Sequence, residues 1–232
     1  MQCSKCKREA VIFQPYSGQY LCPAHLTLDI GTKVRRMIRQ QQWMRPGDHI
    51  GVALTGTAAD NALLFFFQDL TGKRTDIRVS GIPAEGGISG VMAAAGTRGI
   101  TRIALSTTLE QASASLLADI LRGDVEQCTG TDPDLPTTPV LILPFSHIPA
   151  DEITAYARIQ GVEGDTPARQ QDTDPLLMDV QALLAEYSRR HPAAPHAILN
   201  LCETLHSAVR EDSGTYPEAG WGDFPALRLP NS

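Results

Sequence analysis

The chain of 232 residues has no run of about 18 apolar residues, the length that a helix needs to cross a membrane. Its first residues also lack the charged and then apolar pattern of a secretion signal. Cysteine is scarce, and three of the five cysteines lie within the first 22 residues, which does not resemble a disulfide framework. These absences predict a protein of the reducing cytoplasm without a membrane partner.

Positive charge is also in short supply, since 20 Lys and Arg face 26 Asp and Glu for a net charge of −6. A net negative charge argues against a general nucleic-acid binder. The charge is not spread evenly along the chain. Residues 1–50 hold eight Lys or Arg against three acidic residues, while the rest holds twelve Lys or Arg against twenty-three acidic residues. This asymmetry is typical of a basic head that meets phosphates, or of a basic helix face that docks on the protein's own acidic body.

Two short cysteine motifs stand at the start of the chain. Cys3 and Cys6 form C-x2-C, and after fifteen residues Cys22 and His25 form C-x2-H. Two such turns, joined by the hairpin that "VIFQPYSGQYL" predicts, make a closed tetrahedral zinc site. The alternative is a pair of buried free thiols beside an unrelated surface pair. A closed site stabilises a module and leaves no open position for catalysis.

Short apolar strands alternate with helices along the middle of the chain, as in "HIGVALT" followed by "DNALLFFFQDL". This alternation predicts an α/β fold with a doubly wound parallel sheet, an N-terminal zinc ribbon and C-terminal helices. One amphipathic helix is expected at 108–123, with one apolar side formed by Leu109, Ala112, Leu116, Ile120 and Leu121. The expected segments are a zinc ribbon (1–28), a basic linker helix (29–48), the α/β domain (49–165), a helical segment (166–210) and an irregular tail (211–232).

Several stretches, in order, resemble the tRNA 2-thiolation family of PP-loop ATP pyrophosphatases: "CSKC…LCPAHL", "RPGDHIGVALTG", "RIALSTTLEQASASLLADILRGD" and "PVLILPFSHIPADEITAYARIQGV". The resemblance implies a PP-loop fold and enzymes that adenylate a tRNA base and then deliver sulfur from a ubiquitin-like carrier. It also implies that ATP and Mg would bind at the loop after the first strand of the α/β domain.

The nucleotide loop departs from the family's Ser-Gly-Gly-x-Asp-Ser, since the chain reads Thr-Gly-Thr-Ala-Ala-Asp at 55–60. Thr57 puts a Cβ where backbone should approach phosphate, and the Asp60 carboxylate would repel phosphate unless a metal intervenes. With one residue inserted in the loop, Asp60 and Asn61 would instead match the family's Asp-Ser. These substitutions argue against ATP and Mg as cofactors. The residues that would line a nucleotide site are Thr55, Gly56, Thr57, Asp60 and Ser106.

The family's second motif, Gly-His-Asn-Leu-Asp-Asp, is altered as well, because Ser106 begins it and Glu110 and Gln111 replace the two aspartates. The short connection at 81–88 has no cysteine pair, so we expect no iron–sulfur cluster. Cys202 lies in a predicted helix and is expected in the core, whereas Cys128 lies in a loop. No residue presents itself as catalytic.

The leading hypothesis is a degenerate, non-catalytic member of the family that serves tRNA modification as an accessory or as partner of an active thiolation paralogue. Such a protein would meet tRNA through Lys33, Arg36 and Arg39, or meet the ubiquitin-like sulfur carrier, and a homo- or heterodimer is compatible with it. One alternative is an ATP-dependent tRNA-modifying enzyme with a remodelled nucleotide loop. Another is a structural or regulatory protein outside RNA biology.

Overall fold

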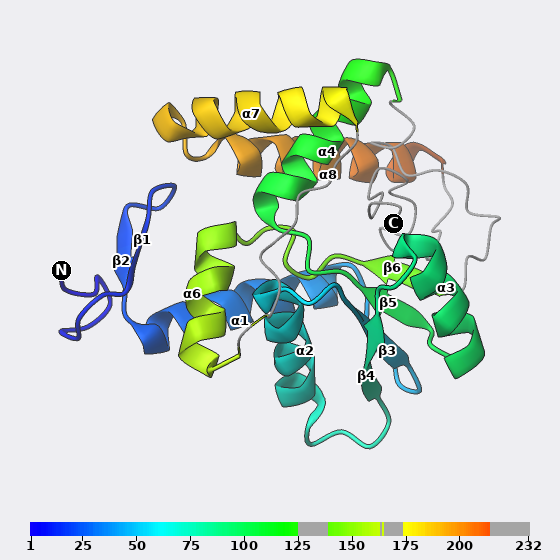
Figure 1. Ribbon diagram of the computed structural model, residues 1–232. Helices are drawn as coiled ribbons and strands as arrows, with labels where there is room; N and C mark the ends of the chain where they lie inside the picture. Colours follow the sequence, from blue (N-terminus) through cyan, green and yellow to red (C-terminus); the bar gives the residue numbers. More distant parts are fainter. Residues whose placement is uncertain (125–138, 163, 165–173, 214–232) are drawn as a thin grey trace.

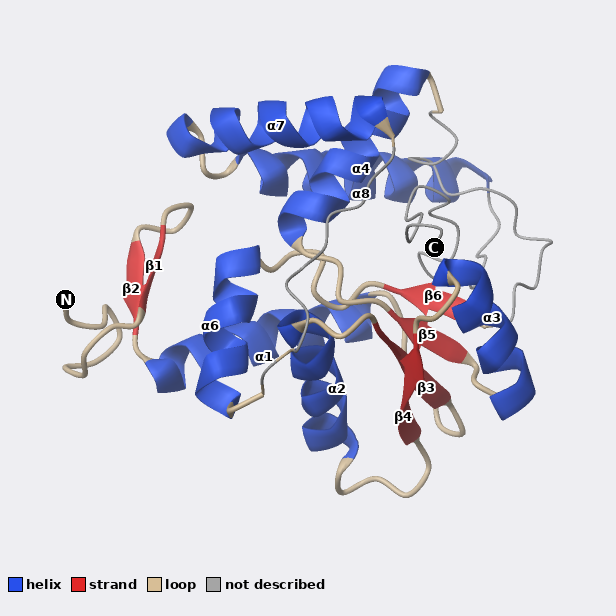
Figure 2. Ribbon diagram, viewed as in Figure 1, coloured by secondary structure: helices blue, strands red, loops and turns tan. Residues whose placement is uncertain are grey.

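The computed structural model of the chain describes residues 1–124, 139–162, 164 and 174–213, without the side chains of 205–213. Figure 1 shows the elements in space, and Figure 2 separates helices from strands. The elements in chain order are β1 (Ile12–Gln14), β2 (Gln19–Leu21), α1 (Pro23–Gln40), β3 (His49–Leu54), α2 (Ala58–Thr71), β4 (Arg78–Pro83), α3 (Gly87–Arg98), β5 (Arg102–Ala104), α4 (Leu109–Arg122), β6 (Val140–Ile142), α6 (Ala150–Gln160), α7 (Pro175–Arg190) and α8 (Ala194–Ser213).

Four parallel strands form the central sheet in the order β4-β3-β5-β6. The central strand β3 is buried along most of its length, with Ile50 and Val52 fully covered. Helices α2 and α3 lie on opposite sides of the sheet (Figure 1). A parallel sheet with helices on both faces is the doubly wound arrangement, so the predicted fold class is confirmed.

The order of the strands places a switch point between β3 and β5. The chain first moves outward from β3 to β4 and then returns to the other side of β3 with β5. Ligands of open α/β sheets bind at the carboxyl ends of the strands at such a point. The loops that follow β3 and β5 carry Thr55, Thr57 and Ser106, so the fold itself brings the candidate nucleotide residues together.

Helices α4, α7 and α8 form a second hydrophobic unit beside the sheet. Leu109 and Leu116 of α4 pack with Leu199 and Cys202 of α8, and the neighbouring side of α4 packs on α7. Cys202 is therefore a core residue, as predicted. The expected apolar side of α4 is only partly right, because Leu121 is 58% exposed and Ile120 is 41% exposed near the end of the helix.

Helix α1 joins the N-terminal hairpin to the sheet domain and packs on α6. Its apolar side, formed by Leu26, Ile30, Val34 and Ile38, is buried in the core that also covers the sheet. The segment limits expected from the sequence stay predictions. Cys128 and nearly all of the expected tail lie outside the described residues. None of the described helices is both long enough and apolar enough to cross a membrane.

Candidate functional site

The first candidate site is the cluster of Cys3, Cys6, Cys22 and His25. Their ligand atoms all lie within 4.8 Å of one another. The turn at 3–6 supplies two thiols. The β1–β2 hairpin returns the chain so that Cys22 stands at the N-cap position of α1 and His25 lies in the first turn of that helix. The predicted pair of facing turns is thus present in the structure.

The distances suit a single metal ion. The Nδ1 atom of His25 lies 3.4 Å from Sγ of Cys3 and 3.4 Å from Sγ of Cys22, and the sulfurs of Cys6 and Cys22 are 3.7 Å apart. A tetrahedron with metal–sulfur bonds of about 2.3 Å has edges of about 3.8 Å, so the four atoms have the right spacing. Two of the four ligand residues, Cys3 and Cys22, are buried.

The pKa values of the Cys3 and Cys6 thiols shift in opposite directions. Burial acts to raise the pKa of Cys3, but bonds from the backbone N–H groups of Lys5, Cys22 and Cys6 outweigh it, and the pKa falls to about 6. The N–H of Arg8 lowers the pKa of Cys6, yet burial and the two neighbouring thiols raise it overall. A thiolate is the form that binds metal, so Cys3 is prepared to act as a ligand near neutral pH.

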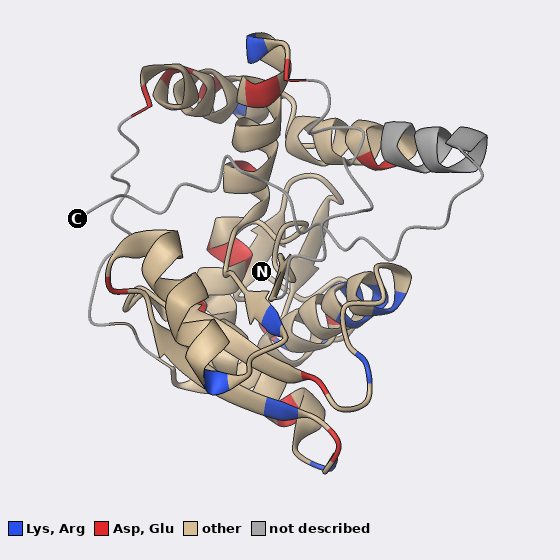
Figure 3. Cartoon of the chain, turned by 90° about the vertical axis from the view of Figure 1, so that its right-hand side faces the viewer, with Lys and Arg blue, Asp and Glu red and all other residues tan. Residues whose placement is uncertain are grey.

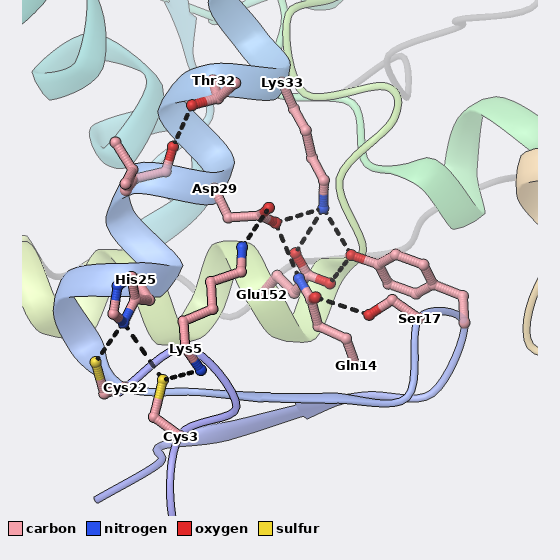
Figure 4. A network of polar contacts seen from close by, with 12 residues as sticks. Cys3, Lys5, Gln14, Ser17, Cys22, His25, Asp29, Thr32, Lys33 and Glu152 are labelled. Carbon is pink, nitrogen blue, oxygen red and sulfur yellow. Dashed lines mark hydrogen bonds and ion pairs between the residues drawn. The ribbon is translucent and has the colours of Figure 1, made fainter. Parts of the chain in front are cut away.

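A polar network fastens this N-terminal head to the body of the protein (Figure 4). The hydroxyl of Tyr16, at the tip of the hairpin, donates to Oε1 of Glu152 in α6 at 2.6 Å. The Lys33 ammonium donates to the Tyr16 hydroxyl at 2.6 Å and lies 3.6 Å from Oε2 of Glu152. The Tyr16 ring also contacts the ring of His196 in α8, with centroids 4.6 Å apart. We call Tyr16, Lys33, Glu152 and Asp29 the latch.

Asp29 completes the latch on α1. It pairs with Lys33 at 2.7 Å, accepts from the Gln14 amide at 3.0 Å and lies 3.8 Å from the Lys5 ammonium. Burial acts to raise the pKa of Asp29, but Lys33, Gln14 and Lys5 lower it overall. For Glu152, which is 1% exposed, burial dominates, and its pKa is raised although Lys33 and Tyr16 act against the rise.

The second candidate site is the loop between β3 and α2, where the Asp60 carboxylate accepts several hydrogen bonds. Oδ2 of Asp60 accepts from the backbone N–H and the hydroxyl of Thr55, both at 2.7 Å, and from the N–H of Thr57 at 3.1 Å. Oδ1 accepts from the Ser106 hydroxyl at 2.5 Å. Thr57 caps α2, and Gly56 adopts a φ of 93°. The five predicted nucleotide residues therefore lie together, and hydrogen bonds to Asp60 join three of them, Thr55, Thr57 and Ser106, to it.

Gly164 covers the same loop from outside. A methyl group built on its Cα would collide with the backbone of Thr57 and Ala58 and would lie 2.8 Å from the carbonyl oxygen of Gly56. Ala58 is the first residue of α2, so Gly164 lies where a phosphate would approach the helix N-terminus. A glycine is required there because the two backbones touch.

In the altered second motif, the side chains of Glu110 and Gln111 also form hydrogen bonds within the protein. The Gln111 side chain accepts from the N–H of Thr108 at 2.9 Å, which closes a capping box at the start of α4. The Glu110 carboxylate accepts from the N–H of Ala150 at 3.0 Å and thereby caps α6. Neither side chain is directed at a ligand by these contacts.

The three predicted RNA-binding residues separate in the structure. The Lys33 ammonium points into the latch (Figure 4), whereas Arg36 and Arg39 are exposed on α1. Figure 3 shows basic residues gathered on the helix that carries them. Sequence reasoning missed Tyr16, Glu152 and Gly164; for the first, the only signal was an aromatic residue at a hairpin tip.

Comparisons with known proteins agree on one family. Residues 2–27 match the family described as 2-thiouridine synthetase TtuA, N-terminal LIM domain. The chain is 31% identical over 97 residues to the tRNA 2-thiolation protein NcsA of Haloferax volcanii, and 32% identical over 71 residues to the cytoplasmic tRNA 2-thiolation protein 1 of Anopheles gambiae. These matches support a place for the chain in the tRNA 2-thiolation family. The matches cover 39% and 31% of this chain but only 30% and 20% of those two relatives.

The same family supplies a solved structure of this fold. It is the U34-tRNA thiolase NcsA from Methanococcus maripaludis, with a TM-score of 0.76 over 89% of this chain and 88% of that chain. The sequence identity of 13% means that this likeness speaks for the fold alone.

The thiolase structure corrects one expectation. We expected no iron–sulfur cluster, but the thiolase is described with its four-iron, four-sulfur cluster, so the expectation is wrong. It rested on the missing cysteine pair at 81–88 and treated the N-terminal thiols as zinc ligands only. Thiolates bind iron–sulfur clusters as well as zinc, so cysteine spacing alone does not exclude a cluster from a member of the tRNA 2-thiolation family.

Removing one ligand tests the metal centre. We expect Cys22→Ser to reduce the bound metal from about one ion per chain to near zero, because three ligands cannot close the tetrahedron. The body should keep its helical signal, since the sheet has its own buried core. Elemental analysis for zinc and iron, with acid-labile sulfide, gives the readout, and Cys202→Ala is the control outside the cluster. An unchanged metal content in Cys22→Ser would show that the cluster of Cys3, Cys6, Cys22 and His25 is not the metal site.

Removing the ammonium from the latch tests its charge balance. We expect Lys33→Met to lower the free energy of unfolding by roughly 2 kcal/mol, because it leaves the buried Glu152 carboxylate without a cation. A carboxyl whose pKa is raised in the fold stabilises below its ordinary pKa and loses that contribution as pH rises. The loss in Lys33→Met should therefore be larger at pH about 8 than at pH about 5.

Denaturant unfolding of both proteins at the two pH values measures this difference. Arg36→Met, on an exposed position of the same helix, is the matched control and should change stability little at either pH. An equal loss at both pH values would show that the Glu152 charge does not cause it.

Proposed function

We propose that this protein is a non-catalytic member of the tRNA 2-thiolation family that supports tRNA modification in the cytoplasm. It acts as an accessory or as the partner subunit of an active family member. The basic helix meets tRNA, and the N-terminal head is a structural module held by a metal ion, for which the donor set of three thiols and one imidazole favours zinc. The head would hold that ion through Cys3, Cys6, Cys22 and His25.

One observation carries the non-catalytic part of the proposal, namely the Asp60 carboxylate in the nucleotide loop. Phosphate-binding loops hold an anion with free backbone N–H groups at a helix N-terminus. Here the N–H groups of Thr55 and Thr57 already donate to an anion that belongs to the chain. A nucleotide phosphate would have to displace that buried carboxylate and then lie beside it, which costs both hydrogen bonds and charge repulsion.

Two further contacts support this proposal. Gly164 lies against the loop at the point of phosphate entry. Glu110, which stands for one of the family's aspartates, caps α6 instead of facing the loop. The loop, its cover and the second motif are thus all used to hold the protein together.

The RNA part of the proposal rests on charge. Arg36 and Arg39 are exposed on α1, while the ammonium of Lys33 is already paired with Asp29 and Glu152. Among the described residues neither arginine forms an ion pair, so both can neutralise phosphates.

Calorimetric titration with Mg-ATP tests the nucleotide loop. We expect no saturable binding by the metal-loaded wild-type protein up to millimolar ATP, because the loop amides are occupied. Asp60→Ser combined with Ala59→Asp restores the family's residues at both positions and should give measurable binding. Asp60→Asn is the matched control, since it keeps the shape and the acceptor oxygen of the side chain.

Saturable binding of ATP by the wild-type protein at cellular concentrations would overturn the non-catalytic proposal. That result would favour the alternative of an ATP-dependent tRNA-modifying enzyme with a remodelled nucleotide loop. Release of pyrophosphate in the presence of tRNA would then be the next assay.

Salt-dependent binding of tRNA tests the basic helix. We expect Arg36→Gln with Arg39→Gln to weaken tRNA binding and to reduce the slope of log K against log salt by about 2, one for each phosphate that is no longer neutralised. Lys73→Gln, at an exposed site between α2 and β4, is the control and should leave the slope unchanged. A slope unchanged in the double variant would exclude this face of α1 from the RNA contact.

A further inference from the structure

The outer face of the β1–β2 hairpin carries an aromatic pair, of which Phe13 is exposed and Tyr20 is half-buried. Phe13 and Tyr20 are cross-strand partners, with ring centroids 4.6 Å apart and ring planes at 34°. Phe13 is 42% exposed, while Gln14 and Leu21, on the inner face, are 3% and 0% exposed. The hairpin therefore turns one side to the protein and offers flat aromatic surface on the other.

The loop that is hydrogen-bonded to the hairpin at Tyr20 carries two exposed cations. Lys7 and Arg8 are exposed, and across the described residues no ion pair engages either of them. The loop that carries them is fastened to the hairpin, because the N–H of Ser4 donates to the Tyr20 carbonyl oxygen at 2.7 Å and the Ser4 hydroxyl accepts from the N–H of Tyr20 at 2.9 Å. The cations are thus held near the aromatic pair.

The hairpin is also held rigid from behind. The Gln14 amide is bonded to Asp29 (Figure 4), and Tyr16 is bonded to Glu152. A surface that is already ordered before binding loses little conformational entropy when a ligand arrives. Figure 1 shows the hairpin at one end of the molecule, projecting beyond α1 and α6.

We propose that the outer face of the hairpin is a stacking platform for an unpaired RNA base, with Phe13 and Tyr20 beneath the base and Lys7 and Arg8 on the adjoining phosphates. Aromatic side chains bind bases of single-stranded RNA through their π-faces, and nearby cations bind the backbone. The exposed cations beside the rings complement the negative charge of an RNA backbone, which favours RNA as the occupant. This site rests on the proposed function and adds a second contact to the basic helix.

The experiment measures RNA affinity of the full-length, metal-loaded protein by fluorescence anisotropy. The probes are tRNA, a short single-stranded oligouridylate and an RNA duplex of equal length. We expect Phe13→Ala and Phe13→Leu to bind the single strand about tenfold more weakly, because both remove the ring. Binding to the duplex should change little. Leu28→Ala, which removes another exposed apolar side chain, is the matched control and should bind as the wild type does.

Phe13→Trp keeps a ring and should retain affinity, and its added fluorescence should be quenched when the oligouridylate binds. Unchanged metal content shows that each variant keeps its head. Wild-type affinity in both Phe13→Ala and Phe13→Leu would overturn the platform and leave the hairpin face to a protein contact, while the tRNA proposal stands. A wild-type protein that binds no RNA would overturn both.

Discussion

The carboxylate of Asp60 is the point at which the loops after β3 and β5 meet. It takes donors from Thr55, Thr57 and Ser106, and it lies at the N-terminus of α2, where the helix dipole favours negative charge. An open parallel sheet leaves exposed N–H groups at this switch point, which ligands of the fold commonly satisfy. In this protein the chain satisfies them itself, and the switch point becomes part of the framework.

In the latch, too, a buried carboxylate is held by groups of the chain itself, and these contacts fix the position of the head. A small hairpin with three-residue strands has little core of its own, so its position depends on what it contacts. Glu152 is nearly fully buried, and one ammonium and one phenol hydroxyl share its charge. Burial raises the pKa of Glu152, so its charge is costly without a partner. Loss of Lys33 should therefore destabilise the latch more than loss of one partner destabilises an exposed ion pair.

Local patterns in the sequence were sufficient for the fold and for the metal cluster. The period of the strands and helices indicates the doubly wound sheet, and the spacing of Cys3, Cys6, Cys22 and His25 places four ligands on two facing turns. The candidate residues of the nucleotide loop could also be named, because loops after parallel strands gather at one edge of the sheet.

The contacts among these residues could not be predicted, because each joins distant parts of the chain. The carboxylate of Asp60 was expected to repel phosphate, but nothing in a linear motif shows that it accepts bonds from Thr55 and Ser106. Gly164 reaches the loop because α6, which precedes it in the chain, packs on α2. The apolar side of α4 was misjudged near Leu121 because α7 and α8 cover the earlier turns only.

The bond from Tyr16 to Glu152 joins residues 136 positions apart, and the contact with His196 reaches still further along the chain. During synthesis the ligands of the head emerge first. At about 5–20 residues per second, Glu152 follows Tyr16 from the ribosome after roughly 7 to 27 seconds. The four metal ligands of the head are thus complete in the nascent chain before the residues onto which the head docks have been made.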